Sequence, residues 1–315
     1  MVEGGQDPGG GHGPDPHNLG QDMHPRRSGL LQVPEPTPAR PAPRSTPGQE
    51  EEGGQGMGGG FRLIIAFISD FGYEDHYAGA MKGAALSINP EVRVVDVCHG
   101  IRKFDVLHGA YVLAGASRAF PKGTIFVVVV DPGVGGPRRG ILLECDGKFY
   151  VGPDNGVFTL IWHDGCRAWE IDMSRFPNAD PTFHGRDVFA PVAALLSLGK
   201  KPEELGKETR DIILLPVRWG SCGIDSCEGS VIHIDSFGNV ISNIRRPSLE
   251  LGRRYRVRVG KWGGVVPFLK TYAEAEVGEP LLLVNSEGLL ELSVREGSAR
   301  ELTGAERLDE FRVLK

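Results

Sequence analysis

Three short apolar runs separated by two helix-like segments constrain the fold of this chain most strongly. The runs are residues 63–68, 92–97 and 124–130, and the helix-like segments are residues 75–89 and 105–120. The last run contains four consecutive valines, which is typical of a strand covered on both faces, as in parallel sheets. Pro90 and Pro121 end the two helical patterns, and Asp105 is placed to cap the second. The alternation predicts an α/β domain with a mainly parallel sheet flanked by helices.

Two further elements extend this predicted domain. Residues 141–144 and 148–151 are joined by Asp146 and Gly147, a pair typical of a tight hairpin turn. Residues 187–198 are strongly apolar and predict a helix packed on the sheet, with Asp187 as its cap.

The pattern changes after about residue 216, where short alternating strands follow one another without helices. They are residues 230–235, 239–244, 255–259, 281–284 and 289–294. Such a series predicts a smaller all-β, barrel-like domain. We therefore expect an α/β domain over residues 61–216, a linker over 217–228 and a C-terminal β domain over 229–315.

Residues 1–60 differ in composition from the rest of the chain. They hold 15 glycines and 10 prolines and show neither helical nor strand periodicity. A segment so poor in apolar side chains cannot offset its ordering entropy, so we expect a disordered extension. The alternative is a mis-assigned start codon, with Met57 just before the predicted fold.

Charge, hydropathy and cysteine content bound the function class. A net charge of −6 argues against nucleic-acid binding, and no apolar run approaches the ~20 residues of a membrane span. The start of the chain lacks the basic and apolar regions of a secretory signal. The five cysteines form no CxxC metal motif; Cys222 and Cys227 could pair locally, but reduced thiols in a cytoplasmic protein are the default expectation.

Two acids follow neighbouring strands of the predicted sheet. Asp70 ends the first apolar run and Asp131 the third, and each is followed by glycines that let a ligand approach the backbone. Ligands of open α/β sheets bind beyond the carboxyl ends of the strands. Asp70 suits a ribose diol, because a carboxylate accepts both hydroxyl hydrogens. Of Arg138 and Arg139, we expect one to pair with Asp131 and the other to be solvated.

A third polar cluster lies at the entry to the last predicted helix. His184 precedes Gly185 in this loop, a position where catalytic side chains are common, although a lone histidine is more often structural. A metal site built from Asp131, His184 and another acid is an alternative, but no HExxH or HxxxH spacing supports it. His99 and His108 are expected to be core or surface residues.

Taken together, these clusters resemble one enzyme family. The matching segments are residues 65–72 (IAFISDFG), 81–83 (MKG), 94–99 (VVDVCH), 130–135 (VDPGVG), 182–187 (TFHGRD) and 237–240 (FGNV). They are similar to the S-adenosyl-L-methionine hydrolases (adenosine-forming), also called SAM hydroxide adenosyltransferases, which are relatives of the fluorinating and chlorinating enzymes. The resemblance runs from about residue 61 to the C-terminus.

The resemblance implies a sheet domain with a C-terminal β domain, assembled as a homotrimer with active sites between subunits. It implies hydrolysis of S-adenosyl-L-methionine to adenosine and L-methionine through attack of water or hydroxide on the ribose 5′ carbon, without metal or cofactor. The family's catalytic aspartate, arginine and histidine fall on Asp131, Arg138 and His184.

The resemblance also assigns the substrate contacts. Asp70 would bind the ribose hydroxyls, and Asp75 and Asp235 the methionine amino group. The adenine and ribose pocket would be lined by Phe183, Asn239 and Tyr272 and closed by Ser286, Glu287, Arg295, Glu296 and Gly297. Glu287 departs from the arginine of the halogenating relatives, and its expected partner is the methionine carboxylate.

Three alternatives remain open. The halogenating relatives have a tyrosine in place of Asp131 and no histidine in place of His184, and they carry a long insertion where this chain has only residues 142–150. A carboxylate at the nucleophile site should also repel a halide ion. A non-catalytic S-adenosylmethionine or adenosine sensor would not need all three catalytic side chains. A metal-dependent hydrolase would lose activity in chelator.

Overall fold

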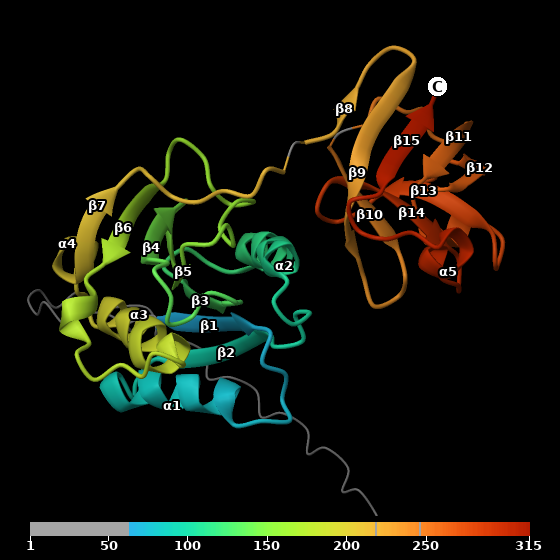
Figure 1. The fold of residues 1–315 in the computed structure, drawn as a ribbon. Helices are drawn as coiled ribbons and strands as arrows, with labels where there is room; N and C mark the ends of the chain where they lie inside the picture. Colours follow the sequence, from blue (N-terminus) through green and yellow to red (C-terminus); the bar gives the residue numbers. More distant parts are fainter. Residues whose placement is uncertain (1–62, 218, 246) are drawn as a thin grey trace, which may run out of the picture. The chain divides into compact units, whose positions relative to one another are not determined.

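The computed structural model describes residues 63–217, 219–245 and 247–315, which form two sheets (Figure 1). The extension expected over residues 1–60 lies outside the described residues, so that expectation remains a prediction. No described helix is both long and apolar enough to cross a bilayer.

The first sheet has seven strands and is mixed. They are β1 (Ile64–Ser69), β2 (Arg93–Cys98), β3 (Ile125–Val129), β4 (Gly140–Cys145), β5 (Lys148–Pro153), β6 (Arg167–Ile171) and β7 (Gly206–Thr209). Their order is β2-β1-β3-β5-β4-β6-β7. The first four in this order are parallel and the β4, β6 and β7 pairings are antiparallel. The predicted α/β class and the β4–β5 hairpin are confirmed, whereas the sequence pattern does not predict β6 and β7.

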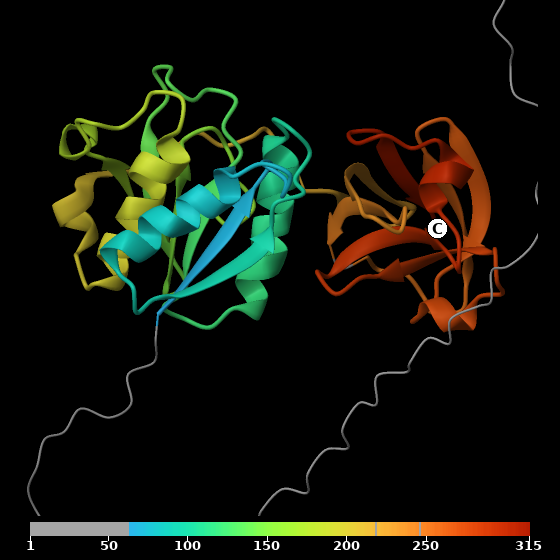
Figure 2. The ribbon, with the colours of Figure 1, turned by 90° about the horizontal axis from the view of Figure 1, so that it is seen from below.

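Helices cover both faces of this sheet (Figure 2). They are α1 (Tyr77–Ile88), α2 (Val106–Ala119), α3 (Ala190–Ser197) and the single turn α4 (Pro202–Leu205). Phe67 and Val127 face one core with residues of α1 and α3, while Ile68 and Val128 face the other core with residues of α2. This alternation explains the continuous apolar runs, because both strand faces are buried. Asp105 caps α2 as predicted, its carboxylate accepting from the backbone N–H of His108 at 2.9 Å.

The chain enters α3 through a π-helical turn, Gly185–Phe189, so the predicted capping role of Asp187 is wrong. Asp187 lies inside this turn and pairs instead with Arg186, while it also accepts from the backbone N–H of Asp180. The helical path begins earlier than the sequence indicates. π-turns often accompany functional sites.

The second sheet is antiparallel and nearly closed into a barrel. Its strands are β8 (Ser221–Cys222), β9 (Ser226–Ile234), β10 (Val240–Arg245), β11 (Arg254–Val259), β12 (Trp262–Pro267), β13 (Pro280–Val284), β14 (Leu289–Val294) and β15 (Glu310–Leu314). The order is β12-β11-β15-β9-β10-β14-β13, with β8 paired to β9. A bridge between Phe268 and Leu282 brings the β12 end of the sheet to β13. Two short helical segments accompany the second sheet, Tyr272–Glu274 and α5 (Ala299–Thr303). A third, Met173–Arg175, follows β6 of the first sheet. The barrel-like β architecture is confirmed.

The structure differs from the expectation of reduced thiols at four of the five cysteines, which form disulfides. Cys145 is bonded to Cys166 and Cys222 to Cys227, and Cys98 is free. The sequence indicates the second pair as a local possibility. It does not indicate the first, because only the antiparallel pairing of β4 with β6 brings residues 21 apart in sequence together.

Candidate active site

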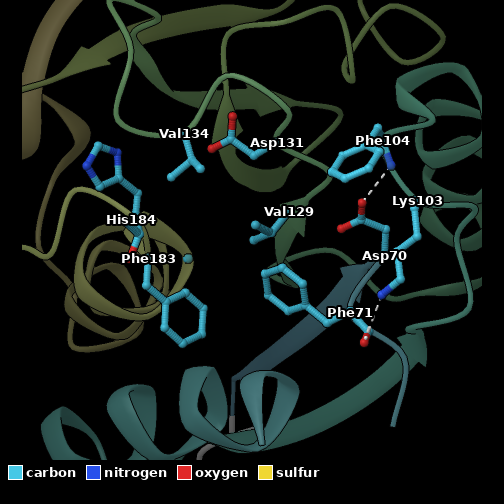
Figure 3. A pocket seen from close by; sticks show the side chains of 11 residues that line it. Asp70, Phe71, Lys103, Phe104, Val129, Asp131, Val134, Phe183 and His184 are labelled. Atoms are coloured by element: carbon cyan, nitrogen blue, oxygen red, sulfur yellow. Dashed lines mark hydrogen bonds between the residues drawn. The ribbon is translucent and has the colours of Figure 1, made fainter. Parts of the chain in front are cut away.

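A cavity of about 380 Å³ opens at the carboxyl edge of the parallel strands (Figure 3). It is lined by Asp70, Phe71, Lys103, Phe104, Val129, Asp131, Val134, Thr182, Phe183, His184 and Gly185. Asp70 follows β1 and Asp131 follows β3, and these strands are parallel neighbours. The sequence-based expectation that both acids would meet at one edge is therefore confirmed.

Asp70 is 6% exposed and held by one backbone donor. Its Oδ2 accepts from the N–H of Phe104 at 2.8 Å. Phe104 itself has a φ of 66°, a left-handed conformation that is uncommon outside glycine. Within the described part of the chain, Oδ1 has no such backbone donor and is available to a ligand hydroxyl. The sequence pattern does not indicate this role of Phe104, although the loop after β2 lies at the same sheet edge as Asp70.

A series of hydrogen-bonded side chains, buried at Ser69 and His99 and exposed at Asp96, starts at the residue that precedes Asp70. Ser69 Oγ is 2.6 Å from His99 Nδ1, and His99 Nε2 is 3.1 Å from Asp96 Oδ1. The order resembles a nucleophilic triad, but Ser69 is fully buried and does not line the cavity. Ser69 Oγ instead accepts from the N–H of Phe71 at 3.3 Å, so the series fixes the loop that carries Asp70. This agrees with the structural role expected for His99.

Asp131, Arg138 and His184 form one contiguous polar cluster. Arg138 binds both carboxylate oxygens of Asp131, Nε to Oδ1 at 3.0 Å and Nη2 to Oδ2. The same Nη2 lies 2.9 Å from His184 Nδ1. Side-chain exposure is 5% for Asp131 and 10% for Arg138, so the pair is screened little by solvent. The predicted return of one arginine onto Asp131 is confirmed for Arg138.

The guanidinium fixes the protonation state of His184. Arginine only donates, so His184 Nδ1 must accept, and a neutral ring then carries its proton on Nε2. Burial lowers the pKa of His184 below 6.5, and the positive charge of Arg138 lowers it further. Asp131 opposes this shift but does not reverse it. The cluster therefore presents a neutral Nε2–H donor beside a fixed guanidinium.

A metal site at this position is not supported by the geometry. Both Asp131 oxygens accept from Arg138, and His184 Nδ1 accepts from the same side chain. A cation would meet a guanidinium at the centre of its ligand set, which is electrostatically unfavourable.

Arg139 is not the solvated arginine that the sequence analysis expected. Its Nε and Nη2 donate to Asp154 Oδ2 at 2.9 and 2.5 Å, and Nη2 also reaches the carbonyl of Asp211. Asp154 is 2% exposed, and Arg139 supplies the positive charge beside it. A buried carboxylate needs a positively charged partner. The residues next to Arg139 in sequence do not indicate that Asp154 is this carboxylate, because the two residues are 15 positions apart.

Gly135 lets the Asp131–Arg138 loop approach the His184 loop. Its φ is +75°, and a Cβ there would lie 2.6 Å from the carbonyl oxygen of Pro181. Gly135→Ala should therefore combine backbone strain with a backbone clash, and we expect a loss of about 2–4 kcal/mol in free energy of unfolding. Denaturant unfolding of the wild type and of Gly135→Ala measures this difference in free energy of unfolding.

Gly288→Ala is the matched control for this prediction. Gly288 has the same φ of +75°, but among the described residues no atom lies within 4 Å of the place that a Cβ would take. It should lose only the strain contribution, about 1 kcal/mol. Equal losses for the two variants would show that the Pro181 contact does not constrain the loop.

An aromatic wall borders the cavity. The Phe183 ring meets Phe71 and Tyr77 edge-on, with centroids 5.7 and 5.4 Å apart. In Figure 3 the rings of Phe71 and Phe183 lie beside each other below Asp131 and His184. Asp75 is exposed and lines an adjoining cavity with Phe71 and Phe183. The first sheet thus brings together the predicted residues Asp70, Asp75, Asp131, Arg138, Phe183 and His184.

The other predicted residues belong to the second sheet and line neither of these cavities. Asp235 and Asn239 form a closed turn, in which the Asp235 carboxylate accepts from Asn239 N at 2.9 Å and Nδ2 at 2.8 Å. Tyr272 donates to the buried Glu291 at 2.8 Å, and burial raises the pKa of both groups. The sequence predicts the Asp235 turn but not the Glu291 partner of Tyr272.

The remaining predicted residues lie in two turns of the second sheet. Ser286 donates to Glu287 at 2.9 Å, and the backbone carbonyl of Glu287 accepts from Arg118 of α2. Arg295 donates to the carbonyl of Ala275 at 2.7 Å and lies 3.6 Å from Glu296. Gly297 follows Glu296 in the same turn.

Two family domains match most of this chain. Residues 65–206 match the SAM hydroxide adenosyltransferase N-terminal domain, and residues 229–312 match its C-terminal domain. The (R)-S-adenosyl-L-methionine hydrolase of Thermus thermophilus is 39% identical over 76% of this chain and 95% of its own length. That of Methanocaldococcus jannaschii is 37% identical over 80% and 95%.

A crystal structure of an uncharacterised conserved protein from Thermotoga maritima superposes with a TM-score of 0.76 at 34% identity. It covers 80% of this chain and all of its own. Fluorinases are more distant, with 31% identity to that of Nocardia brasiliensis over 74% of this chain and 91% of the relative. This chain belongs to the SAM hydroxide adenosyltransferase family, because both family domains match it in order and the hydrolase relatives are covered almost end to end.

Proposed function

We propose that this protein hydrolyses S-adenosyl-L-methionine to adenosine and L-methionine. The observation that carries the proposal is the Asp131–Arg138–His184 cluster: Asp131 and His184 line one cavity with Asp70, and Arg138 binds both of them. The family membership and the hydrolase names of the relatives support the same reaction.

The reaction needs positioning more than acid catalysis. The sulfonium of the substrate leaves as a neutral thioether, so the leaving group requires no proton. Water attacks the ribose 5′ carbon, the new C–O bond replaces the C–S bond, and one proton is released. Holding the nucleophile in line with the breaking bond can lower the barrier by ~7–11 kcal/mol.

Arg138 and His184 are proposed to hold the attacking water. The guanidinium and the His184 Nε2–H both donate, and two donors stabilise the hydroxide character that develops on the oxygen. Asp131 fixes the guanidinium plane through two hydrogen bonds. The aromatic wall of Phe71 and Phe183 excludes competing water.

Asp70 is proposed to bind the ribose diol through Oδ1 while Phe104 N–H holds Oδ2. Asp75, in the adjoining cavity, is proposed to face the methionine amino group. A carboxylate suits an ammonium because the hydrogen bond is charge-assisted.

A second copy of the chain is proposed to complete the site. Asp235, Asn239, Tyr272, Ser286, Glu287 and the Arg295–Gly297 turn are the predicted substrate contacts that line neither cavity of their own chain. A homotrimer in which each second sheet faces a neighbour's cavity would bring both sets together. Cyclic assemblies of this kind repeat one heterologous interface.

Isotope incorporation tests the reaction. The full-length protein is incubated with S-adenosylmethionine in ¹⁸O-labelled water, with and without chelator, and products are read by mass spectrometry. Labelled adenosine and unlabelled methionine, in equal amounts in both arms, are expected. Bound but unchanged substrate would favour a sensor, 5′-halogenated adenosine formed only with added halide would favour the halogenating reaction, and loss in chelator would favour a metal-dependent hydrolase.

Subunit mixing tests the shared site. Asp131→Asn and Asp235→Ala homo-oligomers should each be nearly inactive, whereas co-expressed mixtures should regain a fraction of wild-type turnover. Recovery is expected because some interfaces then combine an intact Asp131 with a neighbour's intact Asp235. Mixtures with no more activity than either parent would place the whole site within one chain.

The acid limb of the pH profile should report His184. Because the folded pKa of His184 lies below 6.5, the neutral ring persists at pH 6.5, and protonation at lower pH removes the Nδ1 acceptor facing Arg138. We therefore expect kcat/KM to fall with decreasing pH along an acid limb centred below pH 6.5. A limb centred above pH 6.5 in stopped assays of adenosine release would contradict this assignment.

We also propose that the protein acts in the cytoplasm. The disulfide-bonded cysteines would be thiols there. Fractionation of the source cells, followed by alkylation of free thiols, tests both statements.

A further inference from the structure

A cluster of cysteine and histidine side chains lies at the C-terminal end of β4. Arg139 precedes the opposite end of this strand. Cys145 ends β4 and Cys166 directly precedes β6. The two strands pair antiparallel with Glu144 opposite Arg167, so the cysteines face each other at the next position. At about 3.4 Å per residue, Cys145 lies about 17 Å along the strand from Gly140. The cluster is therefore separate from the cavity that holds Asp131.

His163 completes the cluster with the two cysteines, and Asp146 adjoins it through His163. One ligand atom each from Cys145, His163 and Cys166 lies within 4.8 Å of the other two. His163 Nε2 is 3.3 Å from Asp146 Oδ1. Zinc bonds to nitrogen and oxygen are about 2.0–2.1 Å, so the edge of a tetrahedral site is about 3.3 Å. The imidazole and the carboxylate already lie at this spacing.

Burial within the cluster suits metal binding from solvent. Cys145 and Cys166 are 2% and 9% exposed, while the His163 and Asp146 side chains are 49% and 73% exposed. The exposed side chains can adjust to an incoming ion, and the sulfurs would be shielded once it is bound. Among the described residues, His163 Nδ1 accepts only from the Gly165 N–H at 3.1 Å, so little is lost when the ring turns.

We propose that the reduced Cys145–Cys166 pair, with His163 and Asp146, binds a thiophilic divalent ion of the zinc class, and that the disulfide closes this site. Two thiolates and an imidazole are the donors that zinc prefers. Reduction by an external dithiol transfers two electrons and two protons to the sulfur–sulfur bond and leaves the dithiol oxidised. Metal binding then releases the two thiol protons. The proposal is independent of the hydrolase function.

Cobalt(II) is the spectroscopic probe. Full-length protein is reduced with a dithiol, passed through an anaerobic desalting column and titrated with Co²⁺. We expect one equivalent to give thiolate-to-cobalt charge transfer and the visible bands of a tetrahedral site, with no signal from the oxidised protein. Zn²⁺ should displace the cobalt.

Variants assign the ligands. Cys145→Ser should abolish the signal, His163→Ala should weaken cobalt binding at least tenfold, and Cys222→Ser, in the other cysteine pair, should leave it unchanged. A signal that survives Cys145→Ser, depends on Cys222, or is absent from reduced wild-type protein would overturn the proposal. Unchanged affinity in His163→Ala would overturn the assignment of the histidine.

Differential alkylation provides a test that needs no variant. Zn²⁺ should protect Cys145 and Cys166 of the reduced wild-type protein from iodoacetamide, as read by peptide mass spectrometry. Cys98, Cys222 and Cys227 should be modified equally with and without the ion. If Zn²⁺ changes the modification of none of the five cysteines, a site at Cys145 is contradicted.

Discussion

His184→Ala should lower kcat by about 10²–10⁴-fold and leave KM within about threefold of the wild type. The ring lies beside Arg138 and donates from Nε2 toward the proposed water, so its loss removes an interaction with the nucleophile and not with the ribose or adenine. An effect confined to kcat is the signature of a group that acts mainly in the transition state. Initial rates of adenosine release, with substrate binding measured by calorimetry, separate the two quantities.

His163→Ala is the control for the loss of a histidine ring. His163 is half exposed and its partner Asp146 lies outside the cavity, so turnover should be unchanged. Added imidazole should restore part of the activity of His184→Ala and leave the activity of the control unchanged. Parallel losses in kcat and substrate affinity would instead place His184 in substrate binding.

Arg138→Lys should lower kcat by about 10²–10³-fold although the charge is kept. An ammonium cannot bind both Asp131 oxygens and reach His184 Nδ1 together, as the guanidinium does. His184 would lose the donor that fixes its tautomer, and the water would lose one of its two donors. Steady-state kinetics and a thermal melt of the same sample measure the effect.

Arg139→Lys is the neighbouring control. Arg139 pairs with Asp154, whereas Arg138 contacts Asp131 and His184, so kcat of Arg139→Lys should stay within about threefold even if the melting temperature falls. Similar losses of kcat in the two variants would mean that activity depends on the intact loop that carries both arginines. The bidentate contact of Arg138 would then have no special role.

The parallel half of the first sheet is predictable because its strands are buried on both faces. That burial requires a continuous apolar run in the sequence, as in residues 124–130. β6 and β7 carry polar residues on exposed positions, and β12 contains two glycines, so neither hydrophobic run nor alternation marks them. The start of α3 is misplaced in the sequence analysis because a π-turn leaves no distinct pattern in sequence.

The site is predictable where position in the sheet decides it. Asp70 and Asp131 follow adjacent strands, and the strand-end rule alone brings them together. The pairing of Cys145 with Cys166 and of Arg139 with Asp154 depends on register between antiparallel strands and on loop contacts. Such contacts arise from tertiary packing, which a single sequence does not encode locally.

The strand order also sets an expected sequence of folding events. The β4–β5 hairpin closes over a two-residue turn, and Asp131 and Arg138 are only seven positions apart in sequence, so both contacts can form within microseconds. Pairing of β1 with β3 must first close a loop of about 60 residues, which slows it. We expect the Asp131–Arg138 loop to be structured before Asp70 packs beside it. Pulsed hydrogen exchange during refolding should therefore protect β4 and β5 amides earlier than those of β1.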